Sequence, residues 1–161
     1  MRAVIQRVRS ADVHVEGRLV SHIDAGVMTL LGCEVGDTQA EVEWVIKKIA
    51  HLRIFEDDSG KMNRSLFETG GQHLIVSQFT LAAEVDQGRR PSFLRAGSPN
   101  VAQELYLSAI ETSKGLGLDT VGGEFQANMQ VSLVNDGPAT FIIERKNALL
   151  ARSSETGSSQ V

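Results

Sequence analysis

The sequence predicts one α/β domain, in which mainly antiparallel strands curl into a barrel-like sheet and two helices flank it. Short apolar segments with alternating or continuous patterns recur along the chain, and glycine-containing turns separate them. Only two segments, near residues 38–51 and 98–115, have helical spacing instead. A length of 161 residues suits one domain with a sizeable core.

The chain is expected to begin with a β-meander. Valines alternate with polar residues in places between residues 2 and 15, Glu16-Gly17 supplies a hairpin turn, and Arg18-Leu19-Val20 begins the returning strand. Residues 26–32 form a further apolar strand, after which Gly36-Asp37 breaks the pattern. Three strands therefore precede the first helix.

Both helices have recognisable start signals. Thr38 and Glu41 have the spacing of a capping box, in which each side chain accepts a hydrogen bond from the other residue's backbone N–H. That helix should end near His51, and its predicted buried stripe is Val42, Val45, Ile46, Ile49 and Ala50. In the second helix Ser98 is the predicted N-cap, Pro99 occupies the first helical position, and Gly115 or Gly117 ends it. Its predicted buried face is Val101, Ala102, Leu105, Ala109 and Ile110.

A short apolar strand in the middle of the chain ends in polar residues. Leu74-Ile75-Val76 follows a flexible Gly70-Gly71 turn, and Ser77, Gln78 and Thr80 come directly after it. Groups at the end of a buried strand are held more rigidly than groups on a loop, so this strand end is the candidate active site. The alternative is that Ser77 and Thr80 only satisfy the backbone of a turn.

The last third of the chain contains a second pair of strand patterns. A period-two row predicts a half-buried strand, formed by Phe125, Ala127, Met129, Val131 and Leu133. The chain should turn at Asp136-Gly137-Pro138 and return through residues 141–143. Beyond Lys146 the composition becomes serine-rich, which predicts a domain over residues 1–146 and a flexible tail over residues 147–161.

Composition limits the classes of partner. A net charge of −4 argues against a protein that wraps long nucleic acid, so no DNA partner is expected. Local contacts with a few phosphates remain open, since basic residues cluster at Lys61/Arg64 and at Arg89/Arg90/Arg95. The alternative is that these charges are merely solvated.

Other features predict a cytoplasmic protein without membrane contact or cofactor. No apolar run approaches the ~20 residues of a membrane span, and the N-terminus lacks the pattern of a signal peptide. The acidic residues 56–58 lack the spacing of a calcium loop, and the four histidines show no metal-site pairing, so no metal is expected. Cys33, the single cysteine, follows an apolar run typical of a buried, inert thiol.

Two stretches resemble the signatures of the D-aminoacyl-tRNA deacylases. Ser77-Gln78-Phe79-Thr80-Leu81 matches the first signature letter for letter, and Asn135-Asp136-Gly137-Pro138-Ala139-Thr140 fits the second. Further ordered matches are Met1-Arg2-Ala3-Val4-Ile5-Gln6-Arg7-Val8, Arg53-Ile54-Phe55, Gly60-Lys61-Met62-Asn63 and Arg90-Pro91-Ser92-Phe93. Because these matches extend to about Glu144, chance similarity is a poor explanation.

The resemblance implies a homodimeric hydrolase with the fold of that family, acting on the ester bond of D-aminoacyl-tRNA. Glycyl-tRNA mischarged on the alanine tRNA is a second candidate substrate. The implied site residues are Ser77, Gln78, Phe79 and Thr80 for catalysis, Gly137 and Pro138 for chiral selection, and Arg89, Arg90, Phe125 and Met129 for the tRNA 3′ end. Members of this family hold the Gly-Pro bond cis, and such a bond is expected to aim the Gly137 and Pro138 carbonyls into the partner's pocket, where they would bind the substrate amino group and exclude an L side chain. The alternative is an ordinary tight turn. For Met129, core packing is the alternative.

The residues themselves favour a backbone-centred chemistry. No Gly-x-Ser-x-Gly elbow is present, and an unactivated Thr80 hydroxyl is a poor nucleophile. N–H groups around Gln78, Phe79 and Thr80 can instead stabilise an oxyanion, and one such donor contributes roughly 3–4 kcal/mol. The ribose 2′-hydroxyl of the substrate can assist. Two other classes stay open: a catalytically silent relative that binds nucleic acid, and a thioesterase or other small-ester hydrolase.

Overall fold

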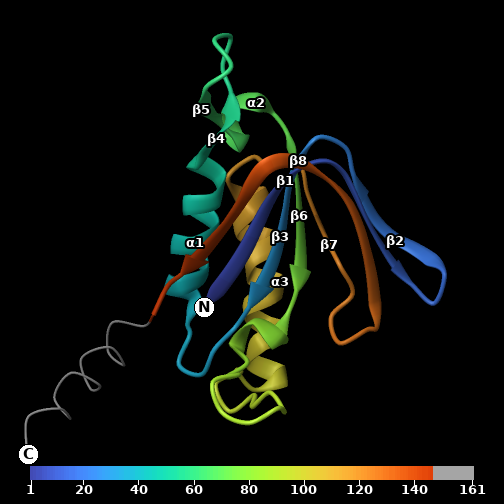
Figure 1. Cartoon of the computed structure of the whole chain (residues 1–161), viewed down its shortest axis with the longest axis vertical. Coiled ribbons are helices and arrows are strands. Elements are labelled where there is room, and N and C mark those ends of the chain that lie inside the picture. Colours follow the sequence, from blue (N-terminus) through green and yellow to red (C-terminus); the bar gives the residue numbers. More distant parts are fainter. Residues whose placement is uncertain (147–161) are drawn as a thin grey trace, which may run out of the picture.

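A computed structural model describes residues 1–146, so the predicted tail, residues 147–161, lies outside the described residues. Figure 1 shows a curled sheet with two long helices on one side of it. In chain order the elements are β1 (Arg2–Val15), β2 (Arg18–Ile23), β3 (Gly26–Gly32), α1 (Gln39–His51), β4 (Arg53–Glu56), β5 (Met62–Ser65), α2 (Leu66–Thr69), β6 (Gln72–Ser77), the 3₁₀ helix η1 (Phe79–Ala82), α3 (Pro99–Gly115), β7 (Thr120–Gly122) and β8 (Met129–Glu144).

The main sheet has the strand order β2-β1-β3-β6-β7, and β8 pairs with the other side of β1. β1 is antiparallel to β2, β3 and β8, which confirms the prediction of mainly antiparallel strands. The exception is β6, which is parallel to β3 and to β7. Parallel neighbours need a crossover connection, and here α1 with α2 and then α3 supply the two crossovers.

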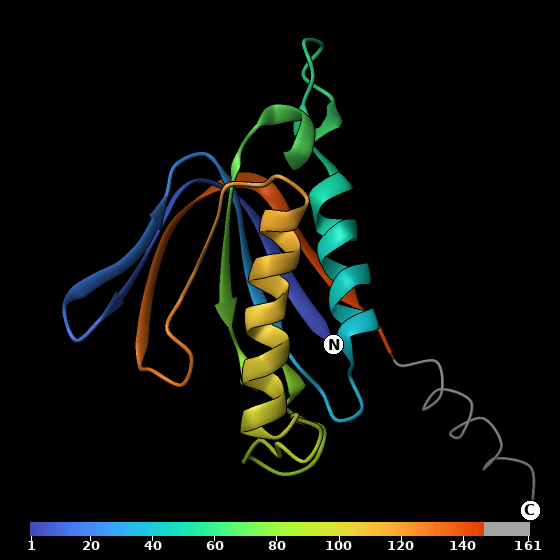
Figure 2. The same cartoon turned by 180° about the vertical axis from the view of Figure 1, so that it is seen from behind.

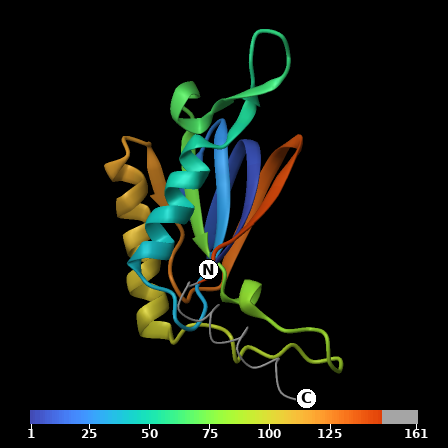
Figure 3. The same cartoon turned by 90° about the vertical axis from the view of Figure 1, so that its left-hand side faces the viewer.

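Two apolar layers hold the fold together. α1 and α3 lie side by side on the convex side of the sheet, as Figures 2 and 3 show, and the larger core fills the space between them and the strands. A second core fills the inside of the curl, and its buried members are Val8, Ala11, Val13, Ile23, Met28, Leu74 and Val76. Alternate side chains of β6 enter the two layers, since Ile75 belongs to the first and Leu74 and Val76 to the second.

Local sequence signals explain most element boundaries. Glu16 and Gly17 both have positive φ angles, 51° and 77°, as the tight hairpin between β1 and β2 requires. The capping box of Thr38 and Glu41 is formed, and every residue of the predicted α1 stripe is buried. α3 begins at Pro99 as predicted, but the Ser98 side chain makes no capping hydrogen bond, and Val101 is 44% exposed rather than buried.

The structure corrects the expected reversal at Asp136-Gly137-Pro138. β8 continues through these residues as one strand and pairs with β1 on both sides of them, from Arg2↔Glu144 to Gln6↔Thr140 and from Val8↔Asn135 to Val15↔Met129. The register shifts between Gln6 and Val8 and between Val8 and Ser10, so the corner is a bulged bend and not a turn. Figure 1 shows β8 arching over the sheet at this point.

Two further expectations need correction. Phe125 and Ala127 lie in the 123–128 connection before β8 and not in a strand. The two predicted helices are present, but the short α2 and the 3₁₀ helix η1 were not predicted, since four residues carry too little periodicity to indicate a helix. Within residues 1–146, no helix combines the length and apolar character needed to cross a membrane.

Candidate active site at the end of strand β6

A cavity of about 1100 Å³ lies where β6 ends. Its walls come from the ends of β3 and β6, the start of α3, and the 123–131 segment. The lining residues are Leu31, Cys33, Val76, Ser77, Gln78, Phe79, Phe93, Ala96, Gly97, Ser98, Pro99, Ala102, Tyr106, Phe125, Gln126, Ala127, Asn128, Met129, Gln130 and Val131. Three of the four predicted catalytic residues, Ser77, Gln78 and Phe79, therefore line one cavity together with Phe125 and Met129.

The backbone after β6 leaves two N–H groups available. The N–H of Gln78 donates to the carbonyl of Leu31 at 2.8 Å, which extends the pairing of β6 with β3. Phe79 and Thr80 are the first two residues of η1, where N–H groups have no acceptor within the helix. The strand end thus presents backbone donors on a rigid support.

The same region depends on a close approach of η1 to β3. A Cβ atom on Gly32 would lie 2.9 Å from the Gln78 carbonyl oxygen and 2.9 Å from the Leu81 Cβ, so only glycine fits there. Arg2 further holds η1 by donating to the Leu81 carbonyl at 3.1 Å. β1 and β3 therefore fix the position of the backbone that follows β6.

Thr80 has a different position from its three neighbours. Its side chain is exposed, its hydroxyl accepts a hydrogen bond from the Gln78 amide, and it is not among the residues that line the cavity. No base contacts this hydroxyl within residues 1–146. The geometry does not show an activated nucleophile at Thr80.

Tyr106 supports the opposite wall of the cavity. Its hydroxyl lies 2.9 Å from the Ile75 carbonyl oxygen of β6 and 3.0 Å from the Gly123 carbonyl oxygen. The N–H of Gly123 also donates to the Ile75 carbonyl at 3.0 Å, and the Tyr106 ring packs against Phe125 with centroids 5.8 Å apart. Tyr106 thus joins α3 to both β6 and the segment that carries Phe125.

The cavity walls carry no charged side chain at neutral pH. Among the described lining residues only Cys33 and Tyr106 titrate, and burial raises the pKa of each to about 12. The prediction of an inert Cys33 agrees with its burial, since only 6% of it is exposed. The N-terminus of α3 also borders the cavity through Ser98 and Pro99, and a helix N-terminus carries a partial positive charge.

The predicted chiral residues, Gly137 and Pro138, lie in the bend of β8. Both are exposed, and their peptide bond is cis. The buried guanidinium of Arg7 donates from Nε to the Asp136 carbonyl at 3.0 Å and pairs with the Asp136 carboxylate at 3.0 Å. Arg9 reaches the other oxygen of that carboxylate at 3.0 Å. Two arginines of β1 therefore anchor the bend.

The bend and the cavity occupy opposite ends of the sheet in one chain. Val8 pairs with Asn135 of β8 and with Gly26 of β3, and Gly26 pairs with Gln72 at the start of β6. Ser77 lies five residues further along β6, or roughly 16 Å at the usual rise per residue. Gly137 and Pro138 thus cannot contact the cavity of their own chain.

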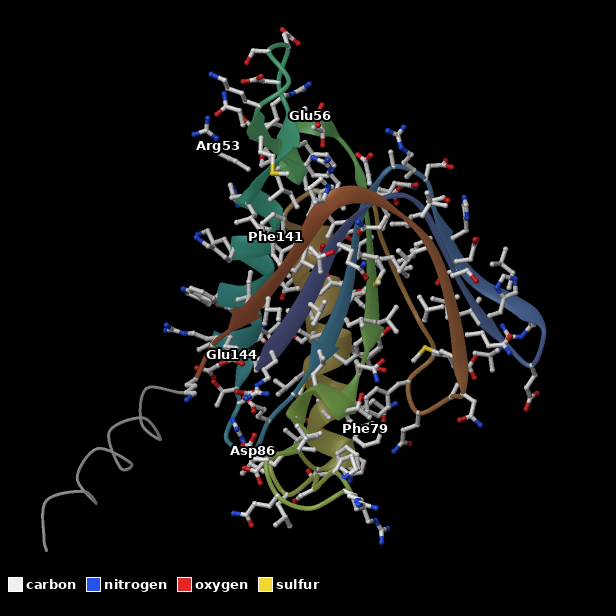
Figure 4. All side chains as sticks on the ribbon, viewed as in Figure 1. Arg53, Glu56, Phe79, Asp86, Phe141 and Glu144 are labelled. Carbon is white, nitrogen blue, oxygen red and sulfur yellow. The ribbon has the colours of Figure 1, made fainter. Side chains whose placement is uncertain are left out.

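The predicted basic residues separate into three groups. Arg89 and Arg90 are exposed in the 83–98 loop, which borders the cavity through Phe93, but they do not line the cavity themselves. Arg95 pairs with Glu34 at 2.7 Å, so its charge is compensated. Lys61 and Arg64 belong to the β4–β5 hairpin. Figure 4 places that hairpin, marked by Arg53 and Glu56, far from Phe79 and from Asp86 of the 83–98 loop.

Sequence reasoning missed three residues that shape the site. Arg7 interrupts the apolar face of β1 with a buried charge, which is a signal for a fixed partner. Tyr106 follows Ala102 by one helical turn and so belongs to the buried face of α3. Phe93 stands in a loop without periodicity, where only its inclusion in the family resemblance indicated a role.

Comparison with known proteins gives a consistent result. The model of the family described as D-Tyr-tRNA(Tyr) deacylase matches residues 4–144. A D-aminoacyl-tRNA deacylase of Pelobacter propionicus is 54% identical over 145 residues, which cover 90% of this chain and 100% of the relative. One from Desulfitobacterium hafniense is 51% identical over 144 residues, covering 89% and 97%.

Two solved structures have the same fold. A structure titled c-Myc DNA Unwinding Element Binding Protein is 40% identical with a TM-score of 0.85, covering 91% of this chain and 100% of that one. A probable eukaryotic D-amino acid tRNA deacylase, 19% identical with a TM-score of 0.74, covers 88% and 98% and shows the shared fold. The chain therefore belongs to the D-Tyr-tRNA(Tyr) deacylase family.

Proposed function

We propose that this chain hydrolyses the ester bond that joins a D-amino acid to the terminal ribose of tRNA. The products are the free D-amino acid and tRNA. The observation that carries this proposal is the uncharged cavity at the end of β6, where the N–H groups of Phe79 and Thr80 begin η1 without an acceptor inside that helix. The family membership of the chain supports the same substrate class.

The proposed mechanism uses the backbone as the catalyst. Water attacks the ester carbonyl carbon, and the N–H groups of Phe79 and Thr80 stabilise the negative charge that develops on the carbonyl oxygen. The 2′-hydroxyl of the ribose accepts a proton from the attacking water and passes its own proton to the 3′ oxygen, so the bond between the carbonyl carbon and the 3′ oxygen breaks and the free amino acid and the tRNA 3′-hydroxyl are released. The role of Gln78 is to orient the Thr80 hydroxyl, because its amide donates to that oxygen.

Chiral selection is assigned to the bend of β8 in a partner subunit. The Gly137 and Pro138 carbonyls would bind the substrate amino group and leave no space for an L side chain. Support comes from the exposure of both residues and from the arginines that anchor Asp136 beside them. Glycine has no side chain to exclude, so this steric selection would also admit glycyl-tRNA, including glycine mischarged on the alanine tRNA.

We expect a homodimer because the two parts of the proposed site, the cavity at the end of β6 and the bend of β8, lie far apart in one chain. Because the bend lies at the other end of its own sheet, only a second copy can bring it to the cavity. Within residues 1–146, β8 pairs only with β1, and its side chains Val134 and Ile142 are exposed by 54% and 72%, which is apolar surface that a second copy could cover. The working unit is proposed to be this dimer, in the cytoplasm, where charged tRNA is used.

The tRNA 3′ end is proposed to enter the same cavity. Phe125 and Met129 would pack on the terminal adenine, since both line the cavity beside Tyr106. Arg89 and Arg90 would face phosphates outside it, since both are exposed in the adjoining loop. Any RNA contact is local in this proposal, as the net charge of −4 requires.

One assay separates this proposal from its alternatives. Purified protein is incubated with D-tyrosyl-tRNA, L-tyrosyl-tRNA and a simple tyrosine ester, and the release of tyrosine is followed. We expect rapid cleavage of the D-aminoacyl-tRNA alone. Equal cleavage of all three would indicate a general esterase, and binding of tRNA without cleavage would indicate a silent nucleic-acid-binding relative.

A second assay tests whether the bend of β8 excludes L-aminoacyl-tRNA. Pro138→Ala should admit L-tyrosyl-tRNA while the cleavage of D-tyrosyl-tRNA is largely kept, because the change enlarges the space at the amino-acid Cα. The exposed Leu107→Ala of α3 is the control for general effects of substitution. Equal loss of both activities in Pro138→Ala would show that the bend does not act by excluding the L side chain.

A further inference from the structure

Two phenylalanine rings lie where the cavity meets solvent. Phe79 and Phe93 both line the cavity, yet 59% of Phe79 and 40% of Phe93 remain exposed. Their ring centroids are 5.1 Å apart, and the ring planes are inclined by 56°. Figure 4 shows Phe79 at this end of the molecule. Two large apolar rings side by side in water form a surface that favours an apolar or aromatic partner.

The backbone holds both rings in place. Phe79 begins η1 directly after Gln78, whose N–H is bonded to β3. Phe93 follows Ser92, which exchanges two backbone hydrogen bonds with Glu84 at 2.8 and 3.0 Å, and the Phe93 carbonyl accepts from Ala96 at 3.0 Å. The pair is therefore formed before any ligand arrives, which lowers the entropy cost of binding.

The positive charges near the two rings favour binding of a negatively charged RNA backbone. Arg89 and Arg90 lie in the loop closed by the Glu84–Ser92 bonds, four and three residues before Phe93. Glu84 and Asp86 share this loop, but within residues 1–146 neither forms an ion pair with the two arginines. The positive end of α3 borders the same cavity.

We propose that Phe79 and Phe93 form a stacking platform for the base of the nucleotide that precedes the terminal adenosine of the substrate RNA. This subsite rests on the proposed function. The adenosine and its ester occupy the cavity, so the RNA chain leaves through the opening that the two rings border. Unpaired bases commonly stack on exposed aromatic side chains, and one such contact is worth about 1–3 kcal/mol. Arg89 and Arg90 face the phosphates of this nucleotide.

The test uses a series of shortened substrates with D-tyrosine on the terminal ribose. The three esters are D-tyrosyl-adenosine, the same ester on the dinucleotide CA, and the same ester on the trinucleotide CCA. We expect kcat/KM of the wild-type protein to rise about tenfold from the adenosine ester to the CA ester. A much smaller rise should follow from CA to CCA, because the platform accepts one base.

Variants of Phe93 identify the side chain responsible. Phe93→Leu should abolish the gain from the second nucleotide, so that the CA ester and the adenosine ester have about the same kcat/KM in this variant. Phe93→Trp should keep the gain, since an indole also stacks on a base. Leu94→Ala is the matched control, because Leu94 is adjacent, 86% exposed and outside the cavity wall.

The outcomes are distinct. If no ester in the series is cleaved, the proposed function fails; if the adenosine ester is cleaved and the CA ester gains nothing, only the platform fails. Equal loss on all esters in Phe93→Leu would give Phe93 a structural role. Sedimentation of Phe93→Leu as a dissociated species would show that a second copy of the chain covers the rings, which also overturns the proposal.

Discussion

At the scale of single residues, the proposed mechanism depends more on backbone atoms than on side chains. Only Cys33 and Tyr106 titrate among the described cavity-lining residues, and the pKa of each is about 12. Side-chain substitutions at the β6 end should therefore be less harmful than in an enzyme with a nucleophilic triad. Thr80 is the position where this difference can be measured.

Thr80→Ala should lower kcat/KM for D-tyrosyl-tRNA by at most about 100-fold, because alanine keeps the N–H group that serves as oxyanion donor. Thr80→Ser should return to near the wild-type value, since it restores the hydroxyl that accepts from Gln78. Single-turnover hydrolysis measures both. A loss of about 10⁶-fold, the size found when a covalent triad member is removed, would make Thr80 the nucleophile.

His73 makes one contribution to the pH dependence of stability. It is fully buried between the Thr29 and Ser113 hydroxyls, each 2.9 Å from a ring nitrogen, and burial lowers its pKa from 6.5 to about 3. Below pH 6.5 the unfolded chain takes up a proton that the folded chain does not. The contribution of His73 is therefore complete above pH 6.5 and declines as the pH falls toward 3.

From this linkage we expect a loss of about 2 kcal/mol of unfolding free energy from His73 between pH 8 and pH 5. Urea unfolding of the wild type and of His73→Gln at both pH values measures it, since all other titrating groups are common to the two proteins. The glutamine variant should be less stable at pH 8 but lose less stability on acidification. Parallel pH dependences would contradict the assignment.

At the scale of elements, α3 positions the far wall of the cavity through one hydroxyl. Tyr106 connects the helix to the Ile75 and Gly123 carbonyls, and Gly123 precedes the segment that holds Phe125. The wall therefore depends on a helix that contributes no catalytic residue to the β6 end.

Tyr106→Phe should raise KM for D-tyrosyl-tRNA a few-fold while kcat changes less than twofold, because the adenine-binding wall loosens and the oxyanion donors stay in place. The lost hydrogen bond should also lower stability by about 1 kcal/mol. Steady-state kinetics and urea unfolding test this together, with the exposed Leu107→Ala as control on the same helix. A fall in kcat at constant KM would contradict a positioning role.

Elements with local signals could be predicted from the sequence, and elements set by distant pairing could not. The capping box and apolar stripe specify α1 within its own residues, and the predicted strand over residues 26–32 has the bounds of β3. Asp136-Gly137-Pro138 has the composition of a turn, yet β8 continues because β1, far away in the sequence, pairs with both of its halves. At the candidate site, the motif singled out Ser77, Gln78 and Phe79, which line the cavity, whereas the anchoring by Arg7 depends on tertiary contact.

At the scale of the whole molecule, the β6 cavity and the β8 bend lie at opposite ends of one sheet. In the proposed dimer each cavity faces the bend of the other subunit. This arrangement can be tested by mixing subunits with different defects.

Pro138→Ala subunits, which should cleave L-tyrosyl-tRNA, are refolded with a tenfold excess of Thr80→Pro subunits, which lack an oxyanion N–H. Most functional cavities then face a normal bend, so cleavage of L-tyrosyl-tRNA should fall severalfold while cleavage of D-tyrosyl-tRNA persists. An excess of subunits carrying both substitutions should give no such fall. Unchanged L cleavage in the first mixture would show that the bend acts within its own chain.

The pairing of β1 with β8 has a consequence for the order of events on the ribosome. Among the strands of residues 1–146, β1 is synthesised first and β8 last, and at ~5–20 residues per second roughly 6 to 25 s separate them. During that interval the edge of β1 that β8 will cover has no partner, although β2 and β3 can already occupy its other edge. Each nascent chain therefore passes through a stage with one open strand edge, and the fold closes only when its last strand leaves the exit tunnel.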